Sequence, residues 1–355
     1  MKINKHIEIV RSSNAAFSSM GQKSCNMIKN ILEQKYERVN ISLVGDMSDL
    51  ERTASKRPDL MFLGVKRLPV NASDKSGKNV WAATYLDDQE LTYTGSGAAA
   101  IALDFSKPRA KQAVKAAGIN TATYFVAQQG TYRCEQDLPS VFPLFVKPPN
   151  GGGGKGIGPD SIVHDFNSLE NRIEYIANKF NTGTLVEEYL PGREFSVALL
   201  EDNDSDKLIA MPVELIAEQN DRGDRILGQS IKANDVEQVI AVQEGSLKQE
   251  VVELAKRVFK TLGARDYGRI DIRLNAQGVP YFLEANLVPG LAMHDFTSYF
   301  TAACWINQAM DYKTMILHIT ELGLSRSAGV NASLHDLVMA DNIASSFLSP
   351  VFDAA

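Results

Sequence analysis

The chain has 355 residues, of which 44 % are hydrophobic and 23 % are charged, a balance that excludes a wholly disordered protein. Its 37 basic and 43 acidic residues give a net charge of −6, which argues against a general nucleic-acid binder or a protein of anionic membrane surfaces. The longest apolar runs have only the length of a strand, so we expect no transmembrane helix.

Strands and helices alternate over the first hundred residues. We predict strands at His6–Val10, Asn40–Val44 and Asp59–Leu63 and a helix at Cys25–Tyr36. This order is typical of a small parallel α/β lobe, which we assign to residues 1–105.

The middle of the chain is richer in strands. A helix with a proline in its first turn follows Ser106. Beyond it, strands at Val141–Lys147 and Thr184–Tyr189 flank a helix at Ser168–Lys179. We place this second lobe at residues 106–190.

A third lobe is expected at residues 191–325, with two hairpins and one amphipathic helix. These elements are, in chain order, Glu194–Leu200, Leu208–Leu215, Leu247–Leu262, Tyr267–Leu274 and Val279–Ala285. Residues 326–355 form a C-terminal tail, in which Leu334–Leu348 is either one amphipathic helix or disordered. The fold class is therefore α/β, built from lobes that each combine helices with a sheet.

The compartment is predicted from the N-terminus and the cysteines. No long apolar segment precedes the first strand, so we expect no signal peptide. The three cysteines are widely spaced and match neither a disulfide framework nor a zinc motif, so we expect reduced thiols and a cytoplasmic protein.

The last hairpin brings acidic side chains together. Side chains alternate faces along a strand, so Arg269, Asp271 and Arg273 share one face. If the turn has an even number of residues, Glu284 falls opposite Asp271, with Asn286 two residues further on. Two carboxylates and an amide form an all-oxygen site that suits Mg²⁺. The alternative is a solvated ladder of arginine–carboxylate pairs.

A glycine-rich loop follows the strand that ends at Lys147. Residues 151–158 contain six glycines, whose backbone N–H groups can approach phosphates that a Cβ would keep away. Lys147 and Lys155 supply cations for a polyphosphate. The loop is not a Walker A motif, since Gly156 follows Lys155 where that motif has serine or threonine. The alternative is a flexible linker.

Two further segments give weaker signals. Gly95–Ala100 fits a loose dinucleotide-binding pattern, but no acidic residue ends a second strand about 20 residues later, so we interpret it as a tight turn into a helix. Glu187 and Glu194 flank the Pro191-Gly192 turn, where acids could bind a nucleobase amine or ribose hydroxyls; alone, this segment is more simply a turn.

Taken in order, these motifs resemble the ATP-grasp superfamily and, within it, the D-alanine–D-alanine ligase family. The matching motifs are Tyr93-Thr94-Gly95-Ser96-Gly97 before Lys107, Val146-Lys147-Pro148 before the glycine loop, Glu187-x-x-Leu190-x-Gly192-x-Glu194-Phe195, Gly268-Arg269-Ile270-Asp271-Ile272 and Leu283-Glu284-Ala285-Asn286-x-x-Pro289-Gly290. The resemblance implies an ATP-grasp fold with an N-terminal Rossmann-like domain, a central subdomain that carries the glycine lid and a C-terminal subdomain with the metal and acceptor sites.

The resemblance also implies roles for single residues. The implied ATP contacts are the phosphate lysines Lys107 and Lys147, the lid residues Gly153, Gly154 and Lys155, the adenine strap of Glu187, Tyr189 and Leu190, and the ribose contact Glu194. The implied ligands of Mg²⁺ or Mn²⁺ are Asp271, Glu284 and Asn286. Arg269 resembles the arginine that steadies the acyl-phosphate and the tetrahedral intermediate. Gly290 resembles an oxyanion donor, and Lys232 a mobile-loop lysine that contacts phosphate and acceptor.

Three positions depart from the family pattern on the donor side. Gly153-Gly154 replace a Ser-Ser pair, and Ala233 replaces a tyrosine. Ser19 stands where the family has a glutamate that holds the ammonium of the first D-alanine. Since these groups together frame the donor, we expect a donor other than D-alanine.

A fourth departure lies on the acceptor side. Asp295, with Phe296 beside it, replaces a serine that binds the acceptor's carboxylate. A carboxylate repels another carboxylate, so we expect a basic acceptor, such as a polyamine or an amide, that lacks a carboxylate at this point. If Asp295 is exposed, or paired with Arg269 or Lys232, this expectation fails.

We therefore predict an ATP-dependent carboxylate–amine ligase that forms an amide or peptide bond through an acyl-phosphate, with substrates other than two D-alanines. One alternative is an authentic D-alanine–D-alanine ligase of cell-wall synthesis. Another is a non-catalytic ATP-binding regulatory protein, against which the retained metal ligands argue. The expected partners are a small-molecule carboxylate donor, an amine acceptor and a second copy in a homodimer, with no nucleic acid or membrane.

Overall fold

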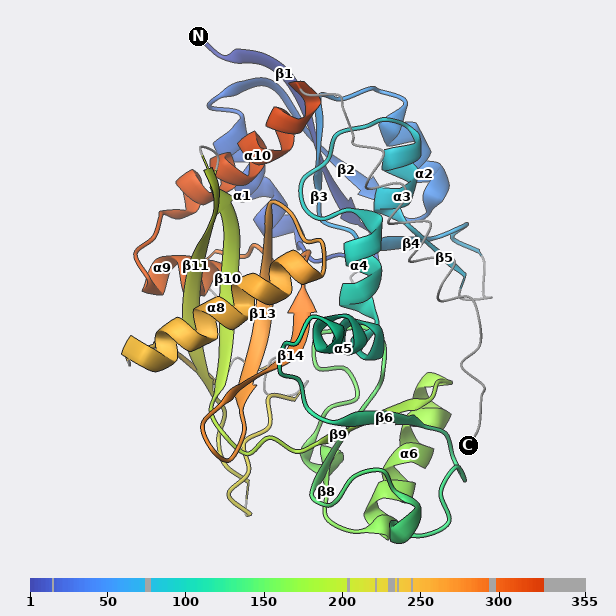
Figure 1. Ribbon diagram of the computed structural model, residues 1–355. Coiled ribbons are helices and arrows are strands. Elements are labelled where there is room, and N and C mark those ends of the chain that lie inside the picture. The colour runs from blue at the N-terminus through green and yellow to red at the C-terminus, as the bar shows by residue number, and fades with distance from the viewer. Residues whose placement is uncertain are drawn as a thin grey trace.

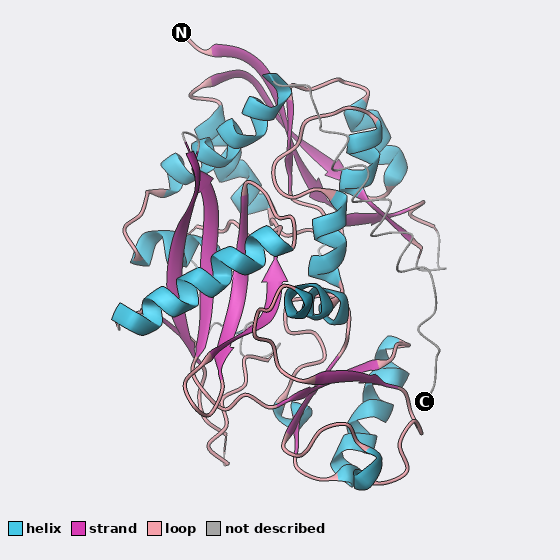
Figure 2. Ribbon diagram, viewed as in Figure 1, coloured by secondary structure: helices cyan, strands magenta, loops and turns pink. Residues whose placement is uncertain are grey.

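The computed structural model describes residues 1–14, 16–73, 78–202, 205–220, 222–228, 234, 236–243, 245–293 and 298–328. It confirms the predicted α/β class, with three main sheets and helices packed against them (Figures 1 and 2). None of the helices in these ranges is long and apolar enough to cross a membrane.

The N-terminal lobe is a parallel sheet in the order β2-β1-β3 with helices against it. Its elements are β1 (Ile3–Ser12), α1 (Gln22–Leu32), β2 (Tyr36–Val44), α2 (Met47–Ala54), β3 (Leu60–Leu63), β4 (Arg67–Pro69), β5 (Asn79–Trp81) and α3 (Ala82–Asp88). The prediction that the helix extends to Tyr36 was wrong, since α1 ends at Leu32. Tyr36 begins β2 opposite Ile3, because its buried ring packs into the core of this lobe.

Two helices, α4 (Ala98–Phe105) and α5 (Lys107–Ala116), lead to the small central lobe. Gly97 is the N-cap of α4, as the interpretation of that segment as a turn predicted. The central sheet has the antiparallel order β6-β9-β7-β8. Its elements are β6 (Tyr124–Ala127), β7 (Leu144–Lys147), β8 (Ile162–Val163), α6 (Phe166–Phe180) and β9 (Thr184–Glu188).

The largest sheet is antiparallel in the order β12-β11-β10-β13-β14. Its elements are β10 (Glu194–Asp202), β11 (Ser205–Ile216), β12 (Gln238–Ala241), α8 (Gly245–Thr261), β13 (Tyr267–Leu274) and β14 (Pro280–Asn286), followed by α9 (Tyr299–Ile306) and α10 (Tyr312–Ala328). Helix α8 crosses one face of the sheet (Figure 1). Ile270, Ile272 and Leu274 pack on the α8 side, which leaves the alternate β13 residues for the other face.

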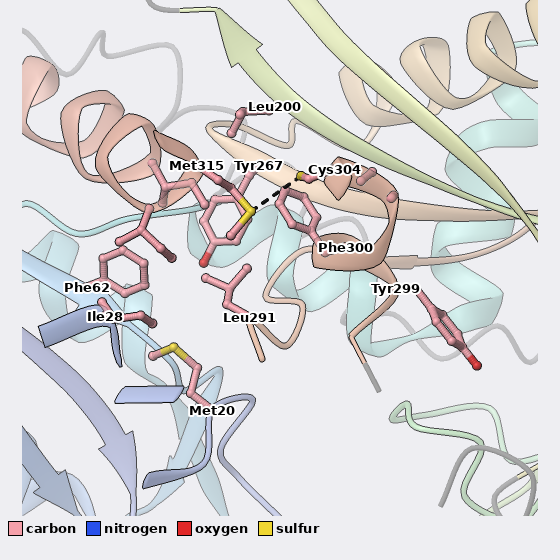
Figure 3. Packing of buried hydrophobic residues seen from close by; sticks show 14 of the residues in the cluster. Met20, Ile28, Phe62, Leu200, Tyr267, Leu291, Tyr299, Phe300, Cys304 and Met315 are labelled. Carbon is pink, nitrogen blue, oxygen red and sulfur yellow. Dashed lines mark hydrogen bonds between the residues drawn. The ribbon is translucent and has the colours of Figure 1, made fainter. Parts of the chain in front are cut away.

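One hydrophobic cluster joins the N-terminal lobe to the largest sheet. Ile28 and Phe62 from the first lobe pack in it with Leu200, Phe300 and Met315 (Figure 3). Helix α10 therefore lies against the N-terminal lobe, although it comes last in the described chain. The cluster also holds Met20, from the loop before α1, and Leu291, from the segment that follows β14 (Figure 3).

Candidate active site

A pocket lies between the central sheet and the largest sheet. Its lining includes the predicted site residues Lys147, Glu187, Tyr189, Leu190, Glu194, Asp271 and Glu284. The apolar residues Ala122, Phe145, Ile157, Leu227 and Leu283 complete much of the wall. The space is about 610 Å³, including the part open to solvent. Residues that are distant in the sequence therefore converge on one concave site.

A β-bulge brings the two predicted carboxylates face to face. Leu274 pairs with Pro280 across a five-residue turn, so uninterrupted pairing would place Leu283 opposite Asp271. The register shifts by one residue between Asp271 and Ile272, and Glu284 takes that place instead. The turn thus has an odd number of residues, whereas we expected Glu284 opposite Asp271 only for an even number. The bulge restores this pairing. Bulges re-aim side chains in this way.

Asp271 is buried and accepts several hydrogen bonds. Its carboxylate accepts a hydrogen bond from Ser196 Oγ (2.7 Å), two from Arg269 (3.0 and 3.1 Å) and one from Asn286 Nδ2 (3.2 Å). Only 3 % of Asp271 is exposed, which argues against a solvated charge ladder. Burial alone would lower the pKa of Arg269, but the Asp271 carboxylate holds it above its ordinary value.

The donor set is compatible with Mg²⁺. Asp271 and Glu284 lie directly opposite each other, and Asn286 Oδ1 lies 3.8 Å from where a Cβ on Gly152 would stand, so this oxygen faces the glycine loop. In the described ranges, no group of three or more His, Cys, Asp or Glu side chains is placed to hold a metal. Mg²⁺ favours a site with few carboxylates, in which phosphate oxygens complete the coordination shell.

Three buried lysines lie around Glu187 and the start of the glycine loop. Glu187 forms ion pairs with Lys111 and Lys147, each at 2.5 Å. Lys107 donates to Gly151 O (2.5 Å) and lies 3.6 Å from Glu284. Burial alone would raise the pKa of Glu187, but the two lysines hold it below its ordinary value. The cluster carries one more positive than negative charge, so it favours an anion.

One arginine bonds to several residues of the segment predicted to hold the nucleoside. Arg273 donates to Glu194 (3.1 Å), Tyr189 Oη (3.4 Å), Gly192 O (3.2 Å) and Arg225 O (2.9 Å). The Tyr189 N–H donates to Pro143 O (3.2 Å). These bonds hold the Glu187–Glu194 segment against the pocket.

The glycine loop is tied to the end of α4 and the start of α5. Gly151 N donates to Phe105 O (2.9 Å), and Lys107 N donates to Pro149 O (2.9 Å). Gly153 and Gly154 have φ values of 70° and 69°, a left-handed conformation that other residues adopt only with strain. Lys155 is exposed in this conformation.

Two of the remaining predicted residues meet where the N-terminal lobe abuts the site. Ser19 O lies 3.3 Å from where a Cβ on Gly290 would stand. The Ser19 hydroxyl donates to Gly64 O (3.2 Å). Lys232, Ala233, Asp295 and Phe296 lie outside the described residues.

Tyr299 and Glu237 extend the site beyond Arg269. The guanidinium of Arg269 lies 4.9 Å from the centre of the Tyr299 ring, and the Tyr299 hydroxyl donates to Glu237. Burial, and then this carboxylate, raise the pKa of Tyr299. Within the described part of the chain, the other oxygen of Glu237 is buried and has no hydrogen-bond partner.

Sequence reasoning missed Lys111, Ser196 and the bonding role of Arg273. A signal was present for the first two. Lys111 follows Lys107 by four residues, which places both on one helix face, and Ser196 shares a strand face with Glu194.

The family model described as "D-ala D-ala ligase C-terminus" matches residues 113–321, more than half of the chain. The D-alanine–D-alanine ligase of Hydrogenovibrio crunogenus is 28 % identical over 61 % of this chain and 66 % of its own length. The D-alanine–D-alanine ligase B of Clostridium perfringens is 26 % identical over 85 % of this chain and 92 % of its own.

Two solved structures have a similar fold. The D-alanine–D-alanine ligase of Bacillus anthracis in complex with ATP matches with a TM-score of 0.69 and 19 % identity, over 91 % of this chain and 99 % of the other. The D-alanine–D-alanine ligase of Coxiella burnetii matches with a TM-score of 0.62 and 15 % identity, over 97 % and 99 % of the two chains.

Proposed function

The chain belongs to the D-ala D-ala ligase C-terminus family. From that premise we propose that it joins a carboxylic acid to an amine through an acyl-phosphate, and that its two substrates are not both D-alanine. As an ATP-grasp ligase it consumes ATP and releases ADP. The observation that carries the proposal is the convergence of Lys107, Lys147, Asp271 and Glu284 on one site.

The side chains of the site suggest how this chemistry is divided. When bound, Mg²⁺ATP supplies the phosphoryl group and a counter-charge for the transferring phosphate. Asp271, Glu284 and Asn286 would hold the metal, and Lys107 and Lys147 would bind the phosphate oxygens. Arg269, which donates two hydrogen bonds to Asp271, would stabilise the negative charge that develops on the reacting carboxyl group.

Positioning by the remaining residues completes this assignment. The backbone N–H of Gly290 would donate to the developing oxyanion, and Glu187, Tyr189, Leu190 and Glu194 would hold the nucleoside. The glycine loop would exclude water, which otherwise hydrolyses an acyl-phosphate. Orientation of this kind contributes up to about 7–11 kcal/mol to catalysis.

D-Alanine as the sole amino acid is expected to be a poor substrate. Gly153 and Gly154 offer no hydroxyl, and the Ser19 hydroxyl donates to Gly64 O, so the groups that frame D-alanine in the family are missing. Phosphate release with D-alanine alone should stay near the rate without any acid. Rapid phosphate release together with D-alanyl-D-alanine would favour the authentic ligase instead.

We also propose a basic acceptor without a carboxylate at the Asp295 end. The Glu237 carboxylate, which accepts a hydrogen bond from Tyr299 beside Arg269, supports this because an acid near the site favours an ammonium group.

Asp295→Ser should weaken basic acceptors and improve acceptors that carry a carboxylate. The measurement is phosphate release with a diamine and with an amino acid, using one fixed donor. An unchanged ratio between the two acceptors would remove this part of the proposal.

The remaining proposals concern the surroundings of the enzyme. We propose a cytoplasmic homodimer; the three free cysteines support the reducing compartment. The lobe boundaries at residues 105, 190 and 325 stay predictions.

A further inference from the structure

Arg67 lies beside two aromatic rings at the junction of the N-terminal lobe and the glycine loop. Its guanidinium carbon is 4.1 Å from the centre of the Phe105 ring and 5.8 Å from that of Phe17. All three side chains are half-buried. Trp81 packs edge-on against Phe105 at 5.5 Å and pairs with Arg67 across the β4–β5 ribbon. Strand pairing therefore holds the backbone of Arg67, and the aromatic rings hold its side chain.

Both rings connect Arg67 to the proposed donor site. Phe17 is two residues before Ser19, whose carbonyl adjoins Gly290. On the other side, Phe105 O accepts from Gly151 N (2.9 Å), and its ring is 4.0 Å from where a Cβ on Gly151 would stand. Arg67 is therefore connected through Phe17 to the segment that adjoins Gly290, and through Phe105 to the glycine loop.

The charge of Arg67 is not neutralised by the described residues. In the part of the chain that the structure describes, its guanidinium forms no ion pair, and burial lowers its pKa. The neighbouring Lys66, by contrast, is paired with the buried Asp104. The Phe105 ring lies close to the guanidinium, whose N–H groups remain suited to planar, bidentate contact with an oxyanion. The apolar rings beside it strengthen such a contact.

We propose that Arg67 binds an anionic group of the donor, so that the preferred donor is an acid with a second carboxylate or similar oxyanion besides the carboxylate that is activated. This inference rests on the proposed ligase function. With Arg67, the donor site would contain a cation. An amino-acid donor would instead require an anion there, to bind its ammonium group.

The test uses hydroxylamine as a general acceptor, so that the natural amine is not needed. Acids are compared in matched pairs that differ by one carboxylate, such as succinate with butyrate and glutarate with pentanoate, and the hydroxamate is measured. The wild type should prefer the diacid of a pair. Arg67→Met should lower kcat/KM for diacids by about 10–100-fold, mainly through KM, and leave monoacids within about 2-fold, while Arg67→Lys retains part of the preference.

Arg38→Met removes an exposed arginine of β2 and is the matched control, expected to behave as the wild type. Binding gives a second readout: with a non-hydrolysable ATP analogue present, the diacid should raise the Tm of the wild type but not of Arg67→Met. Equal loss for both classes of acid, or a wild type without preference in either assay, would overturn the role of Arg67 while leaving the ligase proposal standing. No hydroxamate with any acid, together with no ATP-dependent Tm shift, would overturn both.

Discussion

Asp271→Asn and Glu284→Gln are each expected to lower the rate of ADP formation by about 10²–10³-fold. Each change removes one negative charge from the face where the bulge in β14 brings the two carboxylates together. Without that negative charge, the Mg²⁺ that neutralises the phosphate charge would be bound weakly. The amides keep the size of the acids, so the fold should persist.

Thermal unfolding checks the fold, and ADP formation at saturating Mg²⁺ checks the chemistry. Asp88→Asn, at an exposed position in α3, is the matched control and should retain full activity. Near-native ADP formation by either active-site variant would show that the metal assignment is wrong.

Glu187→Gln is expected to lower the free energy of unfolding by about 3–5 kcal/mol, the range for breaking a buried ion pair. Its carboxylate is the partner of both Lys111 and Lys147, and these side chains are 0–5 % exposed. The amide cannot balance either charge, so two buried ammonium groups would be left facing each other. Urea unfolding measures the difference.

Glu188→Gln is the matched control, because this neighbour is exposed and should change stability by less than about 0.5 kcal/mol. The effect should also depend on pH. The lysines lower the folded-state pKa of Glu187 below 4.5, so its contribution is complete above pH 4.5 and is lost as pH falls through the lowered value. Equal stability of the two variants at pH 7 would contradict the buried network.

The alternation of residues along β13 predicted correctly which side chains leave the α8 face. The pairing with Glu284 could not be predicted with the same ease, because it depends on a one-residue bulge at Leu283. Phe282 and Ala285, on either side of the bulge, both pack in the core cluster that contains α8, and Phe282 also bonds to Asn120 and Thr121 through its backbone. These are long-range contacts.

Long-range contacts account for most of what the sequence left open. Lys111 and Glu187 are 76 positions apart, and their pairing depends on how α5 meets β9. The contact of Ser19 with Gly290 depends on a hydrophobic cluster that joins the first lobe to α9 and α10. The order of the motifs was sufficient to predict the family. The surroundings of Arg67 could not be predicted, because they form only when the lobes pack together.

The most direct test of the central claim follows an oxygen atom. A donor acid that supports ligation is labelled with ¹⁸O in its carboxylate, and the phosphate released during amide formation is analysed by mass spectrometry. If the carboxylate attacks the γ-phosphate and the amine then displaces phosphate, one labelled oxygen passes into the phosphate in each turnover. Phosphate that carries no label would mean that the donor carboxylate does not attack the γ-phosphate, and the protein would not be a ligase that acts through an acyl-phosphate.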